Sequence, residues 1–411
     1  MDKSITFMIS SLFQQKYLTI IFVWIAGSLC LNAQVRTIQS GNLTFKVPEE
    51  YLKESENIPP FWITSLEDIA DYLFRTVKKG QVEIIGTTAG GRPMRAVVYG
   101  RARQGKGTST FSGALGYGNV KAYRGPDHEM TVYWGIAGIH AFEYEGIVGV
   151  VNLVSILETG KDLRGKAWPE ITEIAAKIDR IVLIPVTNPD GRARIPLRMA
   201  LHRGTDNTVG QYLNTGGYPD GTLIGYPQVK EFVPIDLGRS VYPGGYTNDA
   251  GVNLVHDDFF GDKQPETKAL FDLAARERPD LIINMHTGAT YINLYRPVCE
   301  AVMSPVFDSL YVTVHRRLTI ENLQGTKDLS RIRPERVDGF PFNLDAALNM
   351  HCGALSVCVE SPGHSAFAKT SSGEIITHTP DRLLDAQLFV HQESMRFLAE
   401  SGGRAKWTRS K

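Results

Sequence analysis

The chain has 411 residues, of which 43% are hydrophobic and 21% are charged, so it has ample apolar material for a large core. This composition excludes an intrinsically disordered protein, which needs low hydrophobicity and a high net charge. Lys and Arg number 44 and Asp and Glu number 44, so the basic excess typical of nucleic-acid binders is absent and we expect no nucleic-acid partner. The four cysteines are too few for a disulfide-rich scaffold.

Residues 1–33 predict a signal peptide for export. Lys3 and Lys16 precede a continuous apolar run over 17–31, which is shorter than the roughly 18–20 residues that a spanning helix needs. Ala33 supplies a small residue before a cleavage site. The alternative is an uncleaved N-terminal anchor. We expect a periplasmic or extracellular protein with no membrane span after the signal is cleaved.

The rest of the chain predicts strands alternating with helices. An extended lead-in covers 34–60, and apolar residues then recur at helical spacing over 65–77. Further helices are predicted at 143–157, 266–276, 302–323 and 381–398. Buried strands are predicted at 82–86, 94–99, 131–136, 181–186, 281–285 and 355–359. This alternation favours an α/β fold with a mostly parallel sheet, in one domain over 61–400 with a polar tail at 401–411.

Chemically active side chains follow four of the predicted strands, at the point where each strand ends. They are, in chain order, His140 with Glu143, the Thr-Asn-Pro-Asp-Gly turn at 187–191, His286, and Glu360. Ligands of open α/β sheets bind beyond the carboxyl ends of the strands. We therefore expect these side chains to gather at one rim of the sheet.

Two histidines and a carboxylate suit a catalytic zinc ion, which takes three protein ligands and keeps one position open for water. His140 and Glu143 are three residues apart at a strand-to-helix corner, so both can face one point, and His286 can supply the third ligand. Glu360 could take the proton from the metal-bound water. Each motif alone also fits a structural role, as a salt bridge, a buried core histidine or a simple turn. The prediction depends on their order and on their position after buried strands.

At these positions the sequence resembles the zinc carboxypeptidase family, over about 65–400. The matching segments are GIHAFEYEG at 138–146, NPDG at 188–191, PETKAL at 265–270, PDLIINMHTG at 279–288 and SVCVESPG at 356–363. The resemblance implies a mixed, mostly parallel sheet of about eight strands flanked by helices on both faces. It also implies one zinc ion per chain, with a peptide or peptide-like amide as the substrate.

Individual residues carry over from the family pattern. His140, Glu143 and His286 correspond to the zinc ligands, and Glu360 corresponds to the general base. Arg203 falls where an oxyanion-stabilising arginine would follow the NPDG turn, although Arg192, Arg194 and Arg198 are also near. Within that turn, Asn188 is expected to contact substrate.

The chain departs from the family in the segment 251–259. Members often carry G-V-D-L-N-R-N-F there, in which the Asn-Arg pair grips the terminal carboxylate of a substrate. Val255 and His256 replace that pair, and a valine offers none of the paired hydrogen bonds of a guanidinium. Asn253 replaces the aspartate that orients the first ligand histidine, a change of the kind that can cost 10- to 100-fold in metal affinity or activity.

The sequence thus favours an exported zinc metallopeptidase that hydrolyses a peptide amide by carboxypeptidase-like chemistry, with Glu360 as the general base. One alternative is a related amide hydrolase, acting on cell-wall peptides or acyl-amino acids, without recognition of a C-terminal carboxylate. A second alternative is a relative that binds without turnover. Cys299, Cys352 and Cys358 allow at most one disulfide within the chain after the signal is removed.

Overall fold

The structure is a computed structural model that describes residues 35–54, 57–105, 107–108, 120–200, 208–225, 228–230, 234–324, 328–334, 342–364, 367–369 and 375–408. The predicted signal peptide lies outside these residues. No helix in the described part of the chain is long and apolar enough to cross a membrane.

A seven-stranded mixed sheet forms the centre of the described structure, with strand order β3-β4-β6-β5-β7-β9-β8. Its four inner strands, which run parallel, are β6 (Arg180–Ile184), β5 (Val132–Ala137), β7 (Leu281–Thr287) and β9 (Leu355–Ser361). Antiparallel strands complete the sheet, namely β3 (Gln81–Thr87), β4 (Pro93–Gly100) and β8 (Asn293–Leu294). The predicted α/β fold is confirmed, with seven strands among the described residues where about eight were expected.

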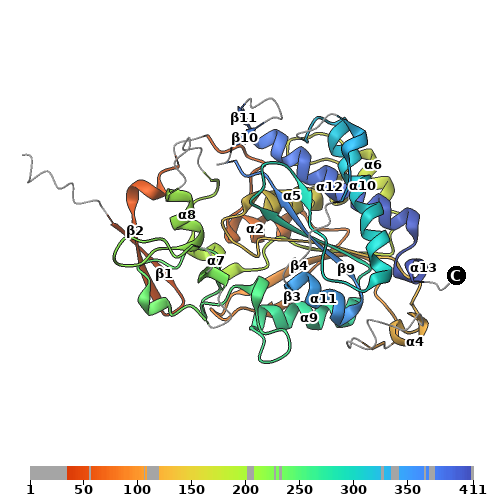
Figure 1. The fold of residues 1–411 in the computed structure, drawn as a ribbon, viewed down its shortest axis with the longest axis horizontal. Helices are drawn as coiled ribbons and strands as arrows, with labels where there is room; N and C mark the ends of the chain where they lie inside the picture. Colours follow the sequence, from red (N-terminus) through yellow and green to blue (C-terminus); the bar gives the residue numbers. More distant parts are fainter. Residues whose placement is uncertain are drawn as a thin grey trace, which may run out of the picture.

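Helices cover both faces of the sheet, as predicted. Figure 1 shows α9 (Pro265–Glu277) and α11 (Leu344–Cys352) below the strands, and α5 (Tyr144–Thr159), α10 (Ser304–Ile320) and α12 (Pro380–Ser401) above them. Along β7, Ile283 and Met285 pack into the core on the α5 side, and Ile282 packs into the core on the α9 side. The inner strands are buried on both faces, which explains why they appear in the sequence as continuous apolar runs.

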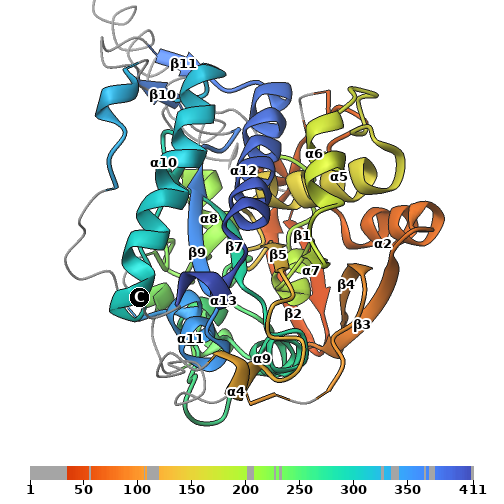
Figure 2. The ribbon, with the colours of Figure 1, turned by 90° about the vertical axis from the view of Figure 1, so that its right-hand side faces the viewer.

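Shorter elements surround this core. The other α-helices are α2 (Leu66–Thr76), α4 (Val120–Arg124), α6 (Pro169–Ala175), α7 (Pro189–Arg194), α8 (Thr208–Thr215) and α13 (Arg404–Trp407). Short 3₁₀ turns are Glu49–Leu52, Gln228–Lys230, Leu237–Arg239, Leu254–His256, Ala301–Met303 and Leu329–Arg331. A small separate hairpin pairs β10 (Phe367–Lys369) with β11 (Ile375–Thr377). Figure 2 shows α10 and α12 side by side across the sheet.

The segment expected to be an extended lead-in forms an antiparallel hairpin of β1 (Val35–Ser40) and β2 (Leu43–Pro48). Its alternate residues Phe45 and Val47 are buried in the main core. At the hairpin turn, the Ser40 hydroxyl donates to Asp249 at 2.8 Å.

Asp249 belongs to a polar network that reaches into the domain. The Arg92 guanidinium bridges Asp249, at 2.7 Å, and Asp190, at 2.8 Å, and Arg194 also binds Asp249. The network therefore joins the hairpin to the loop that leads to Asn253.

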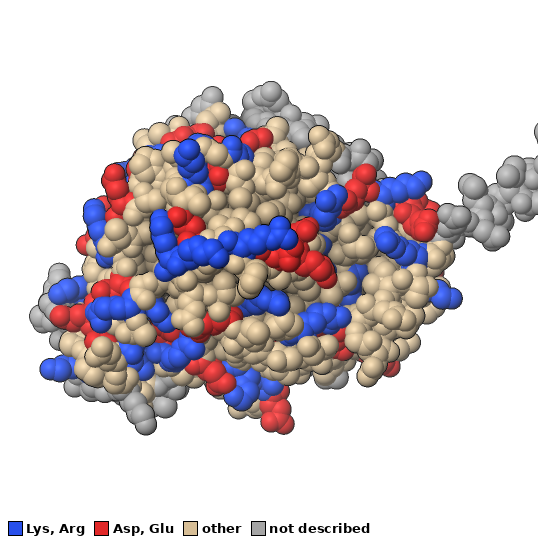
Figure 3. Space-filling view, turned by 180° about the vertical axis from the view of Figure 1, so that it is seen from behind, with Lys and Arg blue, Asp and Glu red and all other residues tan. Residues whose placement is uncertain are grey.

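The end of the chain also differs from the expected polar tail. Residues 404–407 form α13, and the Arg404 side chain is 1% exposed and forms an ion pair with Glu300. Elsewhere the surface mixes the two signs of charge. On the face opposite to that of Figure 1, basic and acidic side chains lie side by side (Figure 3), in keeping with their equal numbers in the sequence.

Candidate metal centre and active-site cavity

The turn between β5 and α5 presents two polar side chains beyond the carboxyl end of the sheet. Gly138 has a φ of +62°, and a Cβ there would lie 3.2 Å from the Pro185 carbonyl oxygen, so the turn requires glycine. His140 follows, and Glu143 is the residue immediately before the first turn of α5. Both side chains are buried, at 5% and 6% exposure.

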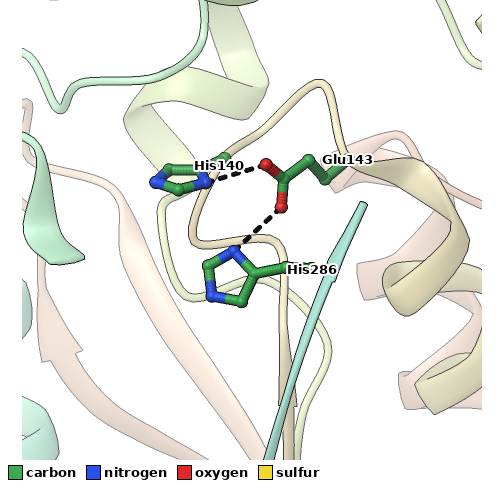
Figure 4. Close-up of side chains that lie close together, drawn as sticks. All are labelled: His140, Glu143 and His286. Atoms are coloured by element: carbon green, nitrogen blue, oxygen red, sulfur yellow. Dashed lines mark hydrogen bonds and ion pairs between the residues drawn. The ribbon is translucent and has the colours of Figure 1, made fainter. Parts of the chain in front are cut away.

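His286 completes a three-residue cluster from the end of β7. Its Nδ1 lies 3.0 Å from Oε2 of Glu143, and Nδ1 of His140 lies 2.8 Å from Oε1 of the same carboxylate. Figure 4 shows both imidazole rings turned toward the Glu143 carboxylate. One ligand atom from each residue lies within 4.8 Å of the other two, a spacing that could hold a metal ion.

The charges within this cluster favour a cation. Burial acts to raise the pKa of Glu143, but the two histidines lower it to about 2. Burial acts to lower the pKa of His286, whereas the charges of Glu143 and Glu360 raise it to about 9. Burial lowers the pKa of His140. The Glu143 carboxylate therefore stays ionised, which is the form that binds a metal.

Two further residues hold the His140 ring in place. Oδ1 of Asn253 lies 3.2 Å from Nε2 of His140, on the side of the ring away from Glu143. The same oxygen accepts from the Val255 N–H at 3.1 Å, and the Asn253 amide donates to the Val229 carbonyl. Tyr246 stacks on the ring with centroids 3.6 Å apart. The orienting position predicted for Asn253 is the one that it occupies.

Glu360 lies on β9 directly beside His286 of β7, because the two residues are paired in the strand register. Gly288 leaves room for it, since a Cβ there would lie 3.1 Å from Oε2 of Glu360. The carboxylate borders a cavity of about 410 Å³ next to the three-residue cluster. Its other lining residues are Phe142, Glu143, Glu145, Ala200, Gly210, Gln211, Asn214, Tyr246, Thr287, Gly288, Ala289, Tyr295 and Gly363.

Glu145 is a carboxylate of this cavity that the sequence analysis missed. Its residue is 1% exposed, and it accepts hydrogen bonds from the Thr287 hydroxyl at 3.0 Å and from the His364 N–H at 2.8 Å. Burial raises its pKa. A signal was available, because Glu145 is a charged residue in the first turn of the otherwise apolar segment predicted as a buried helix.

Three residues predicted to bind substrate are placed elsewhere. Asn188 is fully buried, where it caps α7 by accepting from the Gly191 N–H and donates to the Ile139 carbonyl, so its side chain is structural. Val255 is packed in the core on the α9 and α11 side, and His256 is 7% exposed. Neither borders the cavity. Packing of the 254–256 turn buries both side chains, and a contact of these three residues with substrate stays a prediction. Arg203 lies outside the described residues.

Comparison with known proteins identifies the family of this chain. A family model described as zinc carboxypeptidase, peptidase family M14, matches residues 75–327. That match covers more than half of the chain. The chain belongs to the zinc carboxypeptidase family. The predicted resemblance is thereby confirmed, together with membership of a class of zinc-dependent metallopeptidases.

Solved structures with the zinc carboxypeptidase fold are similar to this chain. A metallo-carboxypeptidase from Burkholderia cenocepacia is 16% identical with a TM-score of 0.50, over 89% of this chain and 77% of its own. A protein assigned as a carboxypeptidase from Burkholderia mallei is 17% identical with a TM-score of 0.50, over 89% and 76%. At these identities the likeness concerns the fold. No curated protein sequence gives a significant match.

The three described cysteines of this zinc carboxypeptidase family member, Cys299, Cys352 and Cys358, form no disulfide with one another. Cys358 lies close to His286 and Glu360, with one potential ligand atom of each within 4.8 Å of the others. Cys352 and Cys358 are buried, and Cys299 is partly exposed.

Proposed function

We propose that the protein is an exported zinc-dependent hydrolase of peptide or peptide-like amides, with His140, Glu143 and His286 as zinc ligands and Glu360 as general base. The observation that carries the proposal is the convergence of three ligand atoms within 4.8 Å beside a cavity that Glu360 borders. Export is proposed from the apolar segment 17–31, which lies outside the described residues.

The donor set fits a catalytic zinc ion. Two imidazole nitrogens and one carboxylate are ligands that zinc takes in hydrolytic sites, where three protein ligands leave a position open. The Glu143 carboxylate already lies between the two Nδ1 atoms, so little rearrangement is needed to place all three around one ion. When bound, zinc supplies a Lewis acid that polarises the amide carbonyl and makes water more acidic.

Glu360 performs the proton transfers. Its carboxylate is half-buried at the edge of the cavity, where it can accept a proton from the attacking water and return it to the leaving amine. Asn253 and Tyr246 hold the His140 ring by a hydrogen bond and by stacking. Glu143 fixes the other side of the ring, so the cluster is oriented before substrate arrives.

A chelator experiment tests the metal-dependent activity. Purified protein should contain about one zinc per chain and should hydrolyse a mixed peptide library, and removal of the metal should abolish the hydrolysis until zinc is restored. His140→Ala should lower the zinc content in the same assay. Stoichiometric zinc without turnover of any amide would favour the binding relative, and protein that never takes up zinc would overturn the zinc assignment.

A related amide hydrolase without C-terminal recognition is the second candidate. It is favoured by the burial of Val255 and His256 outside the cavity, at the positions where the family's carboxylate-gripping pair is expected. Hydrolysis rates of one peptide with a free C-terminus and with a C-terminal amide discriminate the two. A true carboxypeptidase would cleave the free acid far faster, whereas this second candidate predicts rates within about threefold of each other.

A further inference from the structure

The cavity is lined by an excess of acidic groups. Glu143, Glu145 and Glu360 all border it, and its described lining residues include no lysine or arginine. One divalent ion in the proposed zinc site would offset two of these three negative charges. Among the described lining residues, one negative charge then remains.

Glu145 is a carboxylate with no lysine or arginine partner among the described residues, although the charge of His364 acts on it. Its two hydrogen bonds come from neutral donors, the Thr287 hydroxyl and the His364 backbone N–H. No described lysine or arginine forms an ion pair with it. Each carboxylate oxygen can accept a second hydrogen bond. A buried carboxylate without a counter-charge is costly, and a bound cation would offset that cost.

A second hydrogen-bond acceptor of the cavity also lacks a partner. Oδ1 of Asn214 is buried without a hydrogen bond to any described residue, and Asn214 lines the same cavity from α8. Acceptors on two walls are suited to a ligand that donates several hydrogen bonds. A protonated amine offers three donors and a positive charge, whereas a carboxylate offers neither.

We propose that the cavity recognises a protonated amine of the substrate, and that Glu145 binds it. This proposal rests on the proposed amide hydrolase function and names its substrate class, an amide whose neighbouring group carries an ammonium. The ammonium belongs either to a basic side chain or to a free amino terminus. The same excess of acidic groups disfavours a substrate with a carboxylate at this position.

Binding of matched probes is measured by calorimetry on the zinc-loaded protein in a Glu360→Gln background, where hydrolysis is suppressed, so that the test does not depend on turnover. The first probe is acetyl-alanyl-lysine amide, and its neutral counterpart carries norleucine in place of lysine. Alanyl-norleucine amide with a free amino terminus supplies the other source of an ammonium, and acetyl-alanyl-glutamate amide supplies a negative charge. We expect one amine-bearing probe to bind at least about tenfold more tightly than the neutral probe, and the glutamate probe to bind most weakly.

Glu145→Gln removes the charge while keeping the shape. Its amide oxygen can still accept from the His364 N–H, and its NH₂ group can donate to the Thr287 hydroxyl. The preference for the amine should fall below about threefold, with the zinc content unchanged. Thr287→Val is the matched control, because it removes one hydrogen bond of Glu145 but keeps the carboxylate, and it should retain the preference.

Three outcomes would overturn the proposal. They are equal binding of the amine and neutral probes by the parent Glu360→Gln protein, a preference that survives Glu145→Gln, and a preference lost equally in Thr287→Val. If any of these outcomes is found but the protein still hydrolyses neutral peptides with zinc, the proposed function stands and only the amine recognition is overturned. Conversely, an amine preference in a protein that hydrolyses no amide would support recognition and overturn the hydrolase.

Discussion

At the amino ends of the parallel strands, Asp280 and Glu277 each face an arginine, whereas the carboxylates at the carboxyl ends surround a cavity. Asp280 lies 2.6 Å from the Arg124 guanidinium and also accepts from the Val132 N–H, and Glu277 lies 3.0 Å from Arg180. These buried ion pairs at the amino ends hold the starts of the strands together. The carboxylates around the cavity have no such arginine partners among the described residues, and they are suited to a metal ion and a substrate that bring positive charge.

The largest expected effect is on kcat, at the carboxyl ends of the parallel strands. Glu360→Gln should lower kcat by about 10³-fold, because general acid–base catalysis contributes on the order of 10²–10⁴. Zinc content and thermal stability should stay close to those of the wild type, since the amide keeps the shape of the side chain. A variant that retains more than a tenth of the wild-type kcat would remove Glu360 as the general base.

The next largest effect is at the amino end and concerns stability. Asp280→Asn leaves Arg124 buried without its counter-charge, which should lower the free energy of unfolding by about 3 kcal/mol. Denaturant titration measures it. Asp272→Asn is the control, since its pair with Lys268 is about two-thirds exposed and its loss should change stability by under about 0.5 kcal/mol. Equal effects of the two variants would contradict the structural role of the buried pair.

A smaller effect is expected on zinc affinity, at the metal site itself. Asn253→Asp places a charged acceptor behind His140, so zinc affinity should rise by about tenfold in a competition with a chelator. The metal-free chain should become about 1 kcal/mol less stable, since an aspartate cannot donate to the Val229 carbonyl. Unchanged zinc affinity would show that the neutral amide orients the ring as well as a carboxylate.

The last prediction is a pH dependence of stability, at a carboxylate outside the cavity. Glu266 is fully buried, and burial, together with the nearby Asp190, raises its pKa from 4.5 to about 7. The folded chain therefore binds more protons than the unfolded chain between these values, and this group makes stability fall as pH rises from about 4.5 to 7. In Glu266→Gln the fall should be smaller by about 3 kcal/mol across that window. Parallel pH profiles of the wild type and the variant would contradict the raised pKa.

Apolar runs and capping signals explain which parts of the fold the sequence could predict. The strands β5, β6, β7 and β9 are continuous apolar runs, and the helices between them predicted that they run parallel. The hairpin of β1 and β2 was missed although its residues alternate, because most of them are exposed and neither strand is a continuous apolar run. Helix α11 was also missed, although Asn343 caps its start and Gly353, with φ of +73°, ends it.

The residues of the site also fall into those that the sequence could predict and those that it could not. His140, Glu143, His286 and Glu360 could be placed because strand ends bring them to one rim whatever the loops do. Asn188, Val255 and His256 could not, because whether a loop residue is buried or borders a cavity depends on tertiary packing. Glu145 was overlooked because its helix was treated as uniformly apolar, although a charge in a buried segment is itself informative.

The hydrogen bond between Ser40 and Asp249 has a thermodynamic consequence for the metal site. Four residues beyond Asp249, the same loop supplies Asn253, which holds His140, so we predict that opening of the hairpin is coupled to ordering of this ligand. Coupling of this kind is reciprocal. Whatever strengthens zinc binding should therefore also slow hydrogen exchange at the β1 amides, far from any ligand, and the hairpin becomes a remote reporter of the occupied centre.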